Sequence, residues 1–176
     1  MHRLFVAIRP PEQIREQLLD LMGGLHDLHW QNDNQLHLTL RFIGEVERPV
    51  ADDIAAELER LRFERFSIAL DGVGKFEKRR HGAIWADVHP KEELKALAAK
   101  VERACQSAGI EPEQRAYRPH ITLARWNGRA PTLDRFLERH GGLTSARWEV
   151  TEFILFESRL GQGGAHYEPV ERYSLN

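Results

Sequence analysis

The chain has 176 residues, of which 41% are hydrophobic and 30% charged, and this composition is typical of a soluble globular protein. The net charge of −2 excludes a protein that is basic overall, so any contact with nucleic acid must come from local clusters of cations. A single cysteine, Cys105, excludes an intramolecular disulfide, and no apolar run is long enough to span a bilayer. The opening residues read as a strand and not as a signal peptide, so we expect a cytoplasmic protein.

The first half of the chain predicts two strands, each followed by a helix. Residues 3–9 are β-rich and lead through two prolines into a helix whose apolar positions fall at helical spacing, until a pair of glycines ends it. Residues 35–43 alternate polar and apolar side chains, as a half-buried strand does. A second helix is expected at 49–61, where the isoleucine and leucines share one face.

Two further strands are expected in the middle of the chain, at 66–73 and 82–88. The residues between them contain a cluster of cations, which are Lys75, Lys78, Arg79 and Arg80. Such a cluster can hold phosphate groups, but taken alone it is more typical of a solvated loop. We therefore interpret it as a basic surface loop.

The clearest helix spans 90–109, because it begins with a proline, has two glutamates in its first turn and ends at a glycine. A strand at 119–125, a short helix at 132–142 and strands at 150–160 and 166–175 complete the chain.

This order of elements predicts an α+β fold and not a doubly wound sheet or a purely antiparallel sandwich. Two strand-helix-strand-strand groups each contain one copy of a short motif, which suggests a duplicated unit. No linker separates the halves. We therefore expect one domain over residues 1–176, made of two pseudo-symmetric lobes with antiparallel sheets around a central cleft.

The repeated motif is His-x-Thr-x, at 37–40 ("HLTL") and 120–123 ("HITL"). Strand side chains alternate between faces, so in each copy two apolar residues enter the core while the histidine and the threonine share the open face. One such copy alone is a plausible exposed strand surface. Two copies, each in an apolar run, favour a paired active site.

Imidazole can give or take a proton near neutral pH, and a threonine hydroxyl can donate a hydrogen bond to an anionic oxygen. Two facing motifs predict a clamp that holds a phosphate between one acidic and one basic histidine. In-line displacement at phosphorus requires these roles on opposite sides of the phosphate. Proton transfer handles both oxygens in this scheme, so we expect no metal and no cofactor.

With "LFVAI" near the start, "RFIGEV" after the first motif, "RPHITLAR" around the second and "YEPVERYSL" at the end, the chain resembles the 2H phosphoesterase superfamily. More narrowly it is similar to the RNA 2′,3′-cyclic phosphodiesterases, first described as 2′-5′ RNA ligases. The resemblance implies hydrolysis of an RNA 2′,3′-cyclic phosphate to a 2′-phosphate. It implies that His37 is the proton donor to the leaving O3′ and that His120 is the proton acceptor that activates water.

The resemblance further implies that Thr39 and Thr122 bind the non-bridging phosphate oxygens, and that Arg125 contacts the phosphate. Strict alternation places Arg125 on the core face with Leu123, so it reaches the site only if the strand ends or twists there. The implied partner is an RNA end with a cyclic phosphate, such as a tRNA half or an oligonucleotide. We expect a monomer, no membrane contact, and 2′-5′ ligation as the possible reverse reaction.

Phe42, His81 and Tyr167 are candidate RNA contacts. Phe42 lies on the Leu40 face by alternation and is therefore expected in the core, although the resemblance leaves a stacking role open. His81 is equally a surface histidine. Trp85, Trp126 and Trp148 are expected to pack in the core or at its rim.

Other candidates are weaker. His26 and His29 are spaced as metal ligands can be, but without a third ligand an exposed loop is favoured. Cys105 lies among apolar helix positions and is expected in the core.

Two alternatives to this hydrolase remain open. One is a noncatalytic RNA-binding α+β module, which usually presents aromatic residues where this chain has histidine and threonine. The other is a 2H phosphodiesterase that acts on a different cyclic or 2′-5′ nucleotide.

Overall fold

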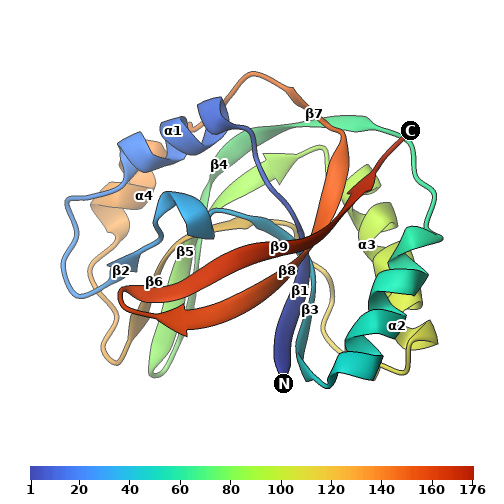
Figure 1. Ribbon diagram of the computed structural model, residues 1–176. Coiled ribbons are helices and arrows are strands. Elements are labelled where there is room, and N and C mark those ends of the chain that lie inside the picture. The colour runs from blue at the N-terminus through green and yellow to red at the C-terminus, as the bar shows by residue number, and fades with distance from the viewer.

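One bent, antiparallel sheet connects the whole molecule (Figure 1). The computed structural model describes residues 1–176, and its main strand order is β7-β4-β5-β6-β3-β1-β8-β9, with β2 paired to β6. The elements in chain order are β1 (His2–Ile8), α1 (Glu12–Leu21), β2 (His29–Trp30), the 3-10 helix η1 (Asp33–Gln35), β3 (Leu38–Val46), α2 (Arg48–Glu59), β4 (Phe66–Lys78), β5 (His81–His89), α3 (Glu92–Ser107), β6 (Ile121–Asn127), α4 (Asp134–His140), β7 (Trp148–Val150), β8 (Glu152–Gly161) and β9 (Gly164–Ser174).

The sheet forms two lobes that meet between β3 and β6, where only Leu38 and Ile121 pair. The first lobe contains β1, β3, β8 and β9, and the second contains β4, β5, β6 and β7. The last two strands of the chain thus return to lie beside the first, as the red and blue strands of Figure 1 show. The predicted α+β fold with antiparallel strands is confirmed, and the structure adds that the first lobe combines both ends of the chain.

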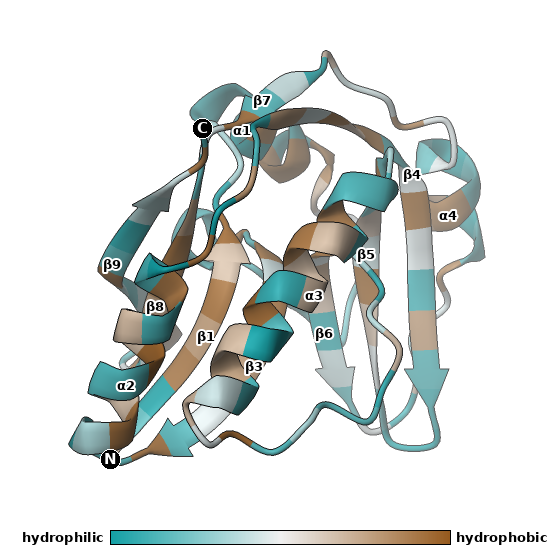
Figure 2. Cartoon of the chain, turned by 90° about the vertical axis from the view of Figure 1, so that its right-hand side faces the viewer, coloured by the Kyte–Doolittle hydropathy of each residue, from teal (hydrophilic) through white to brown (hydrophobic).

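Each lobe carries two helices on its outer face. Helices α2 and α3 pack against each other over the first lobe, where Figure 2 shows the hydrophobic strand β1 behind them. Helix α1 is tied to the second lobe because Gln17 donates a hydrogen bond of 2.7 Å to the carbonyl of Thr144, which bridges to β4. No helix is long and apolar enough to cross a membrane.

The core positions of α3 are those that its helical spacing predicts. Leu94, Leu97, Val101 and Cys105 are all fully buried. Burial raises the pKa of the Cys105 thiol to about 11, so the thiol is protonated at neutral pH. The expectation that Cys105 is a core residue is confirmed.

A buried cation ties β3 to α3. Arg41 is 8% exposed, and its guanidinium donates to the carboxylate of Glu102 and, at 2.6 Å each, to the carbonyls of Phe42 and Glu111. Glu102 also accepts from the backbone N–H of Glu113, at 3.0 Å. These bonds fix the segment that approaches the second motif against the strand that carries the first.

Several features of the elements differ from the sequence prediction. The strands that carry the motifs begin at Leu38 and Ile121, directly after the two histidines, and not at residues 35 and 119. Most of the basic loop is strand, because β4 continues to Lys78 and β5 begins at His81, which leaves only Arg79 and Arg80 in the turn. The short strands β2 and β7 were not predicted, because two or three residues contain no periodicity to detect. His26 and His29 are exposed as expected, with His29 in β2 and not in a loop.

Replacing Arg41 with alanine removes the cation that pairs with Glu102 between β3 and α3. We expect the free energy of unfolding, measured by urea denaturation, to fall by about 2 to 3 kcal/mol. The control is Arg48→Ala, which removes an exposed ion pair with Asp52 on α2 and should cost less than about 0.5 kcal/mol. Equal, small losses in both variants would contradict a structural role for the Arg41 network.

Candidate active site

Both His-x-Thr-x motifs alternate between the core and an open face. Leu38 and Ile121 are fully buried, whereas Thr39 is exposed and His120 and Thr122 are partly exposed. Each motif therefore turns its histidine and its threonine away from the core that Leu38 and Ile121 enter, and the aromatic side chains around His37 leave it only 6% exposed.

The pairing of the two lobes brings the motifs together. Leu38 is the antiparallel partner of Ile121, so this register puts His37 across from Thr122 and His120 across from Thr39. The open face thus carries two imidazoles and two hydroxyls in a pseudo-twofold arrangement.

A β-bulge follows each motif and decides which side chains join it. In β6, Thr122 pairs with Trp85 and Arg125 pairs with Ala83, so Leu123 is the extra residue between them. Trp85 and Ala83 are two positions apart and share a face, which places Arg125 on the face of Thr122. Strict alternation predicts the opposite face for Arg125, and the bulge is the reason that it fails here.

A bulge of the same kind in β3 changes the face on which Phe42 lies. In β3, Thr39 pairs with Ala7 and Phe42 pairs with Phe5, so Leu40 is the extra residue. Phe42 is 44% exposed, and the guanidinium of Arg3 lies 5.0 Å from its ring centroid. The prediction that Phe42 is a core residue was wrong, because the bulge turns it to the open face. Phe42 and Arg125 occupy equivalent positions after the two motifs.

His37 lies in an aromatic cage on the first lobe. Its ring centroid is 5.7 Å from that of Phe5, 4.5 Å from that of Phe156 and 5.1 Å from that of Tyr167. Burial lowers its pKa to about 4, a shift that the carbonyl of Gln35 opposes without forming a regular hydrogen bond to Nδ1. In the free protein at neutral pH, His37 is therefore neutral.

His120 is held more firmly by its surroundings. Its Nδ1 lies 2.7 Å from the carbonyl oxygen of Arg118, and its ring centroid is 5.4 Å from that of Trp85. A neutral imidazole that donates from Nδ1 to a carbonyl keeps its lone pair on Nε2. Burial lowers the pKa of His120, and the positive charge of Arg125 lowers it further. The arrangement suits a proton acceptor.

Two contacts at the site were not predicted from the sequence. The hydroxyl of Tyr117 donates a hydrogen bond of 2.9 Å to the carbonyl of Thr39, which links the loop before the second motif to the first motif. The indole of Trp85 lies over Gly74, where an added Cβ would be 2.7 Å from Nε1. A lone tyrosine or glycine has no periodicity that indicates such a role.

The remaining candidates lie at different distances from the motifs. Tyr167 contacts His37 and is fixed by Asn34, which bonds both its backbone N–H and its carbonyl. His81 is exposed at the start of β5, four residues from Trp85. Trp126 is 1% exposed and packs in the core as expected.

The chain has no group of three or more His, Cys, Asp or Glu side chains placed to hold a metal ion.

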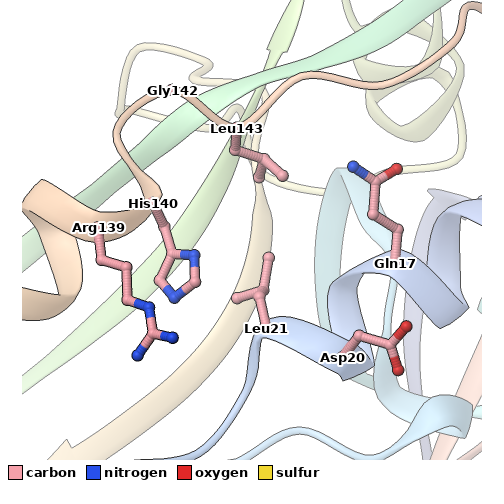
Figure 3. A pocket seen from close by; sticks show the side chains of 7 residues that line it. All are labelled: Gln17, Asp20, Leu21, Arg139, His140, Gly142 and Leu143. Atoms are coloured by element: carbon pink, nitrogen blue, oxygen red, sulfur yellow. The ribbon is translucent and has the colours of Figure 1, made fainter.

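A hollow between α1 and the end of α4 is separate from this site. Figure 3 shows its lining, which consists of Gln17, Asp20, Leu21, Arg139, His140, Gly142 and Leu143. Its histidine, His140, packs on Phe136 with ring centroids 4.5 Å apart. No residue of either motif lines the hollow.

Comparison with known proteins identifies the family. A model of the 2′-5′ RNA ligase superfamily matches residues 8–162. The chain belongs to this superfamily. It is 39% identical over 140 residues to the RNA 2′,3′-cyclic phosphodiesterase of Aeropyrum pernix, covering 77% of this chain and 80% of that protein. It is 29% identical to the RNA 2′,3′-cyclic phosphodiesterase of Escherichia coli, covering 98% of this chain and 96% of that one.

Solved structures of the superfamily share the whole fold. The structure of E. coli LigT in complex with 3′-AMP is similar with a TM-score of 0.83 and 28% sequence identity, covering 99% of this chain and 98% of that chain. The two lobes and the strands that carry both motifs are therefore features that this member shares with a nucleotide-binding relative.

The depressed pKa of His37 predicts a pH-dependent stability. The unfolded state takes up a proton below the ordinary pKa of about 6.5, while the folded state stays neutral down to about 4. The His37 contribution is therefore complete above pH 6.5 and is lost as the pH falls toward 4, by about 3 kcal/mol. Urea denaturation of the wild type and His37→Gln across this range measures the difference.

In the His37→Gln variant, the decline in stability between pH 6.5 and 4 should be shallower than in the wild type. The exposed His26→Gln variant is the control and should keep the wild-type slope. Identical slopes in all three proteins would contradict the burial of a neutral His37.

Proposed function

We propose that this protein is an RNA 2′,3′-cyclic phosphodiesterase, which hydrolyses a terminal 2′,3′-cyclic phosphate to a 2′-phosphate. The observation that carries the proposal is the pairing of Leu38 with Ile121, because its register puts two imidazoles and two hydroxyls on one open face. The names of the A. pernix and E. coli relatives support the substrate class, as does 3′-AMP bound to LigT.

His120 is the proton acceptor in this mechanism. Its Nδ1 faces the carbonyl of Arg118, which leaves Nε2 free to take a proton from water. The water oxygen then forms its bond to phosphorus on the side opposite O3′. Arg125 helps to keep His120 neutral before the reaction.

His37 is the proton donor to the leaving oxygen. As the P–O3′ bond breaks, His37 gives its proton to O3′ and the product keeps its phosphate on O2′. Burial alone favours neutral His37, so the acid role depends on the substrate. A phosphate anion beside the imidazole favours its charged form and raises its pKa.

Thr39 and Thr122 hold the non-bridging oxygens of the phosphate, since both hydroxyls share the face of the histidines. Arg125 adds a positive charge that stabilises the extra negative charge of the transition state. Phe42 at the equivalent position of the first lobe offers an exposed ring to a base, and Tyr167 closes the site beside His37.

The natural substrate is an RNA end such as a tRNA half, and the protein acts in the cytoplasm as a monomer without a metal ion. The same histidines with exchanged roles catalyse 2′-5′ ligation, although water at bulk concentration favours hydrolysis.

A phosphodiesterase for another cyclic nucleotide and a noncatalytic RNA-binding module are the alternatives. The presence of two histidines and two threonines at the centre of the sheet, where such modules present aromatic residues, favours catalysis over the module.

Removal of either histidine tests the mechanism. We expect His37→Ala and His120→Ala each to lower kcat by about 10²- to 10⁴-fold on an oligonucleotide with a cyclic-phosphate end, because each loses one proton transfer. Circular dichroism and thermal melting show whether each variant is folded. His26→Ala, an exposed histidine outside both motifs, should keep wild-type activity. Full turnover by a folded variant of either catalytic histidine would exclude the two-histidine mechanism.

Analysis of the product tests the position of cleavage. Incubation of the wild-type protein with the same oligonucleotide should release only a 2′-phosphate end, identified by its resistance to a 3′-specific phosphatase. EDTA should leave the rate unchanged, because imidazoles carry both protons. A 3′-phosphate product would keep the superfamily and reject the cyclic phosphodiesterase subfamily, and strong inhibition by EDTA would indicate a metal-dependent mechanism.

A further inference from the structure

The β4–β5 hairpin extends the open face of the second lobe beyond the motifs. Trp85, beside His120, lies on this face, and positions two and four residues before it in β5 lie there too. These positions are Ala83, which pairs with Phe76, and His81, which pairs with Lys78. Cross-strand partners share a face, so Phe76 and Lys78 also lie on the side of the candidate active site.

Phe76 is an exposed aromatic ring between two basic groups. It is 37% exposed, the ammonium of Lys78 lies 5.3 Å from its ring centroid, and the ring of His81 lies 5.7 Å away. Aromatic rings next to cations bind single-stranded nucleic acids, because bases stack on the ring while the cations contact phosphates.

The end of this hairpin has unbalanced positive charge. Arg79 and Arg80 form the turn, both are exposed, and neither they nor Lys78 has a carboxylate partner. The carbonyl of Arg80 accepts a 2.6 Å bond from the N–H of Gly128, which brings the loop with Arg129 against the turn.

The β8–β9 hairpin of the first lobe has no such excess of positive charge. Arg159 on β8 pairs with Glu157 at 3.4 Å and with Glu168 at 3.1 Å. A polyanion that extends away from the active site is therefore attracted toward the β4–β5 hairpin and not toward the β8–β9 hairpin.

The other face of the same hairpin behaves differently. Lys75 pairs with Ile84, a fully buried residue, and so points to the opposite face from Phe76. There its ammonium lies 3.1 Å from the carboxylate of Glu77. The hairpin thus separates Lys75, whose charge is neutralised on one face, from Lys78, which has no carboxylate partner on the other, and Lys75 provides an internal control.

We propose that Phe76, Lys78, Arg79, Arg80 and His81 form a hairpin track that binds the RNA nucleotides preceding the cyclic-phosphate end. His81 and Trp85 are four positions apart in β5, about 13 Å at the usual rise, which is enough for nucleotides beyond the terminal one. Phe76 stacks a base and the cations of the turn contact phosphates. The inference rests on the proposed function and specifies its substrate as an oligonucleotide in preference to a cyclic mononucleotide.

The test compares two substrates, 2′,3′-cyclic AMP and a short oligoribonucleotide that ends in the same cyclic nucleotide. Phe76→Ala should lower kcat/KM for the oligonucleotide by about tenfold and leave the mononucleotide unaffected, since only the longer substrate reaches the track. Leu160→Ala, an exposed apolar residue at the β8–β9 hairpin, is the matched control and should change neither rate.

The charge contribution is measured by salt dependence. In the combined variant Lys78→Gln, Arg79→Gln and Arg80→Gln, the slope of log kcat/KM against log salt for the oligonucleotide should become shallower by about 2. Lys75→Gln removes a cation from the same hairpin but from the opposite face, and should leave the slope unchanged.

The outcomes separate this inference from the proposed function. Normal turnover of the mononucleotide with unchanged oligonucleotide rates in Phe76→Ala and the charge variant would overturn the track alone. Loss of mononucleotide turnover in these variants would mean that the hairpin supports the catalytic site and is not a track. If wild-type protein hydrolyses neither substrate, the proposed function fails and the track fails with it.

Discussion

The pairing of Leu38 with Ile121 is the constraint on which the site depends. Both side chains are fully buried, so the hydrophobic effect fixes which face of each strand is turned inward. Because the strands are antiparallel, burial of these two residues places each histidine opposite the other motif's threonine. A slip of one residue in either strand would turn its histidine and threonine into the core.

The bulges at Leu40 and Leu123 act after this register is set. Each adds a residue to its strand and reverses the alternation, so that the fifth residue after the histidine faces the site. This residue is Arg125 in one lobe and Phe42 in the other. The two bulges are thus equivalent in the backbone, while the side chains that they turn to the site differ.

Charge is distributed more unevenly than the net value of −2 suggests. Arg41 is neutralised by Glu102 beneath the first lobe, and Arg159 by Glu157 and Glu168 at its edge. Lys78, Arg79 and Arg80, which are consecutive in sequence at the β4–β5 turn, have no carboxylate partner. Composition alone therefore excluded overall attraction to RNA but could not exclude a local one, because pairing depends on which side chains fold together.

Sequence periodicity determined the helices, most of the strands and the buried residues of α3. Within each motif it also determined that the histidine and the threonine share a face. Local alternation and spacing are sufficient for these features, since each depends only on nearby residues.

Tertiary structure alone decided the pairing of the motifs, the return of β8 and β9 to the first lobe, and the faces of Phe42 and Arg125. The reason is that a bulge or a strand partner is defined between segments far apart in the chain. The basic cluster shows the same limit. Its residues were correctly identified from the sequence, but only the pairing of β4 with β5 separates Lys75 from Lys78 onto opposite faces.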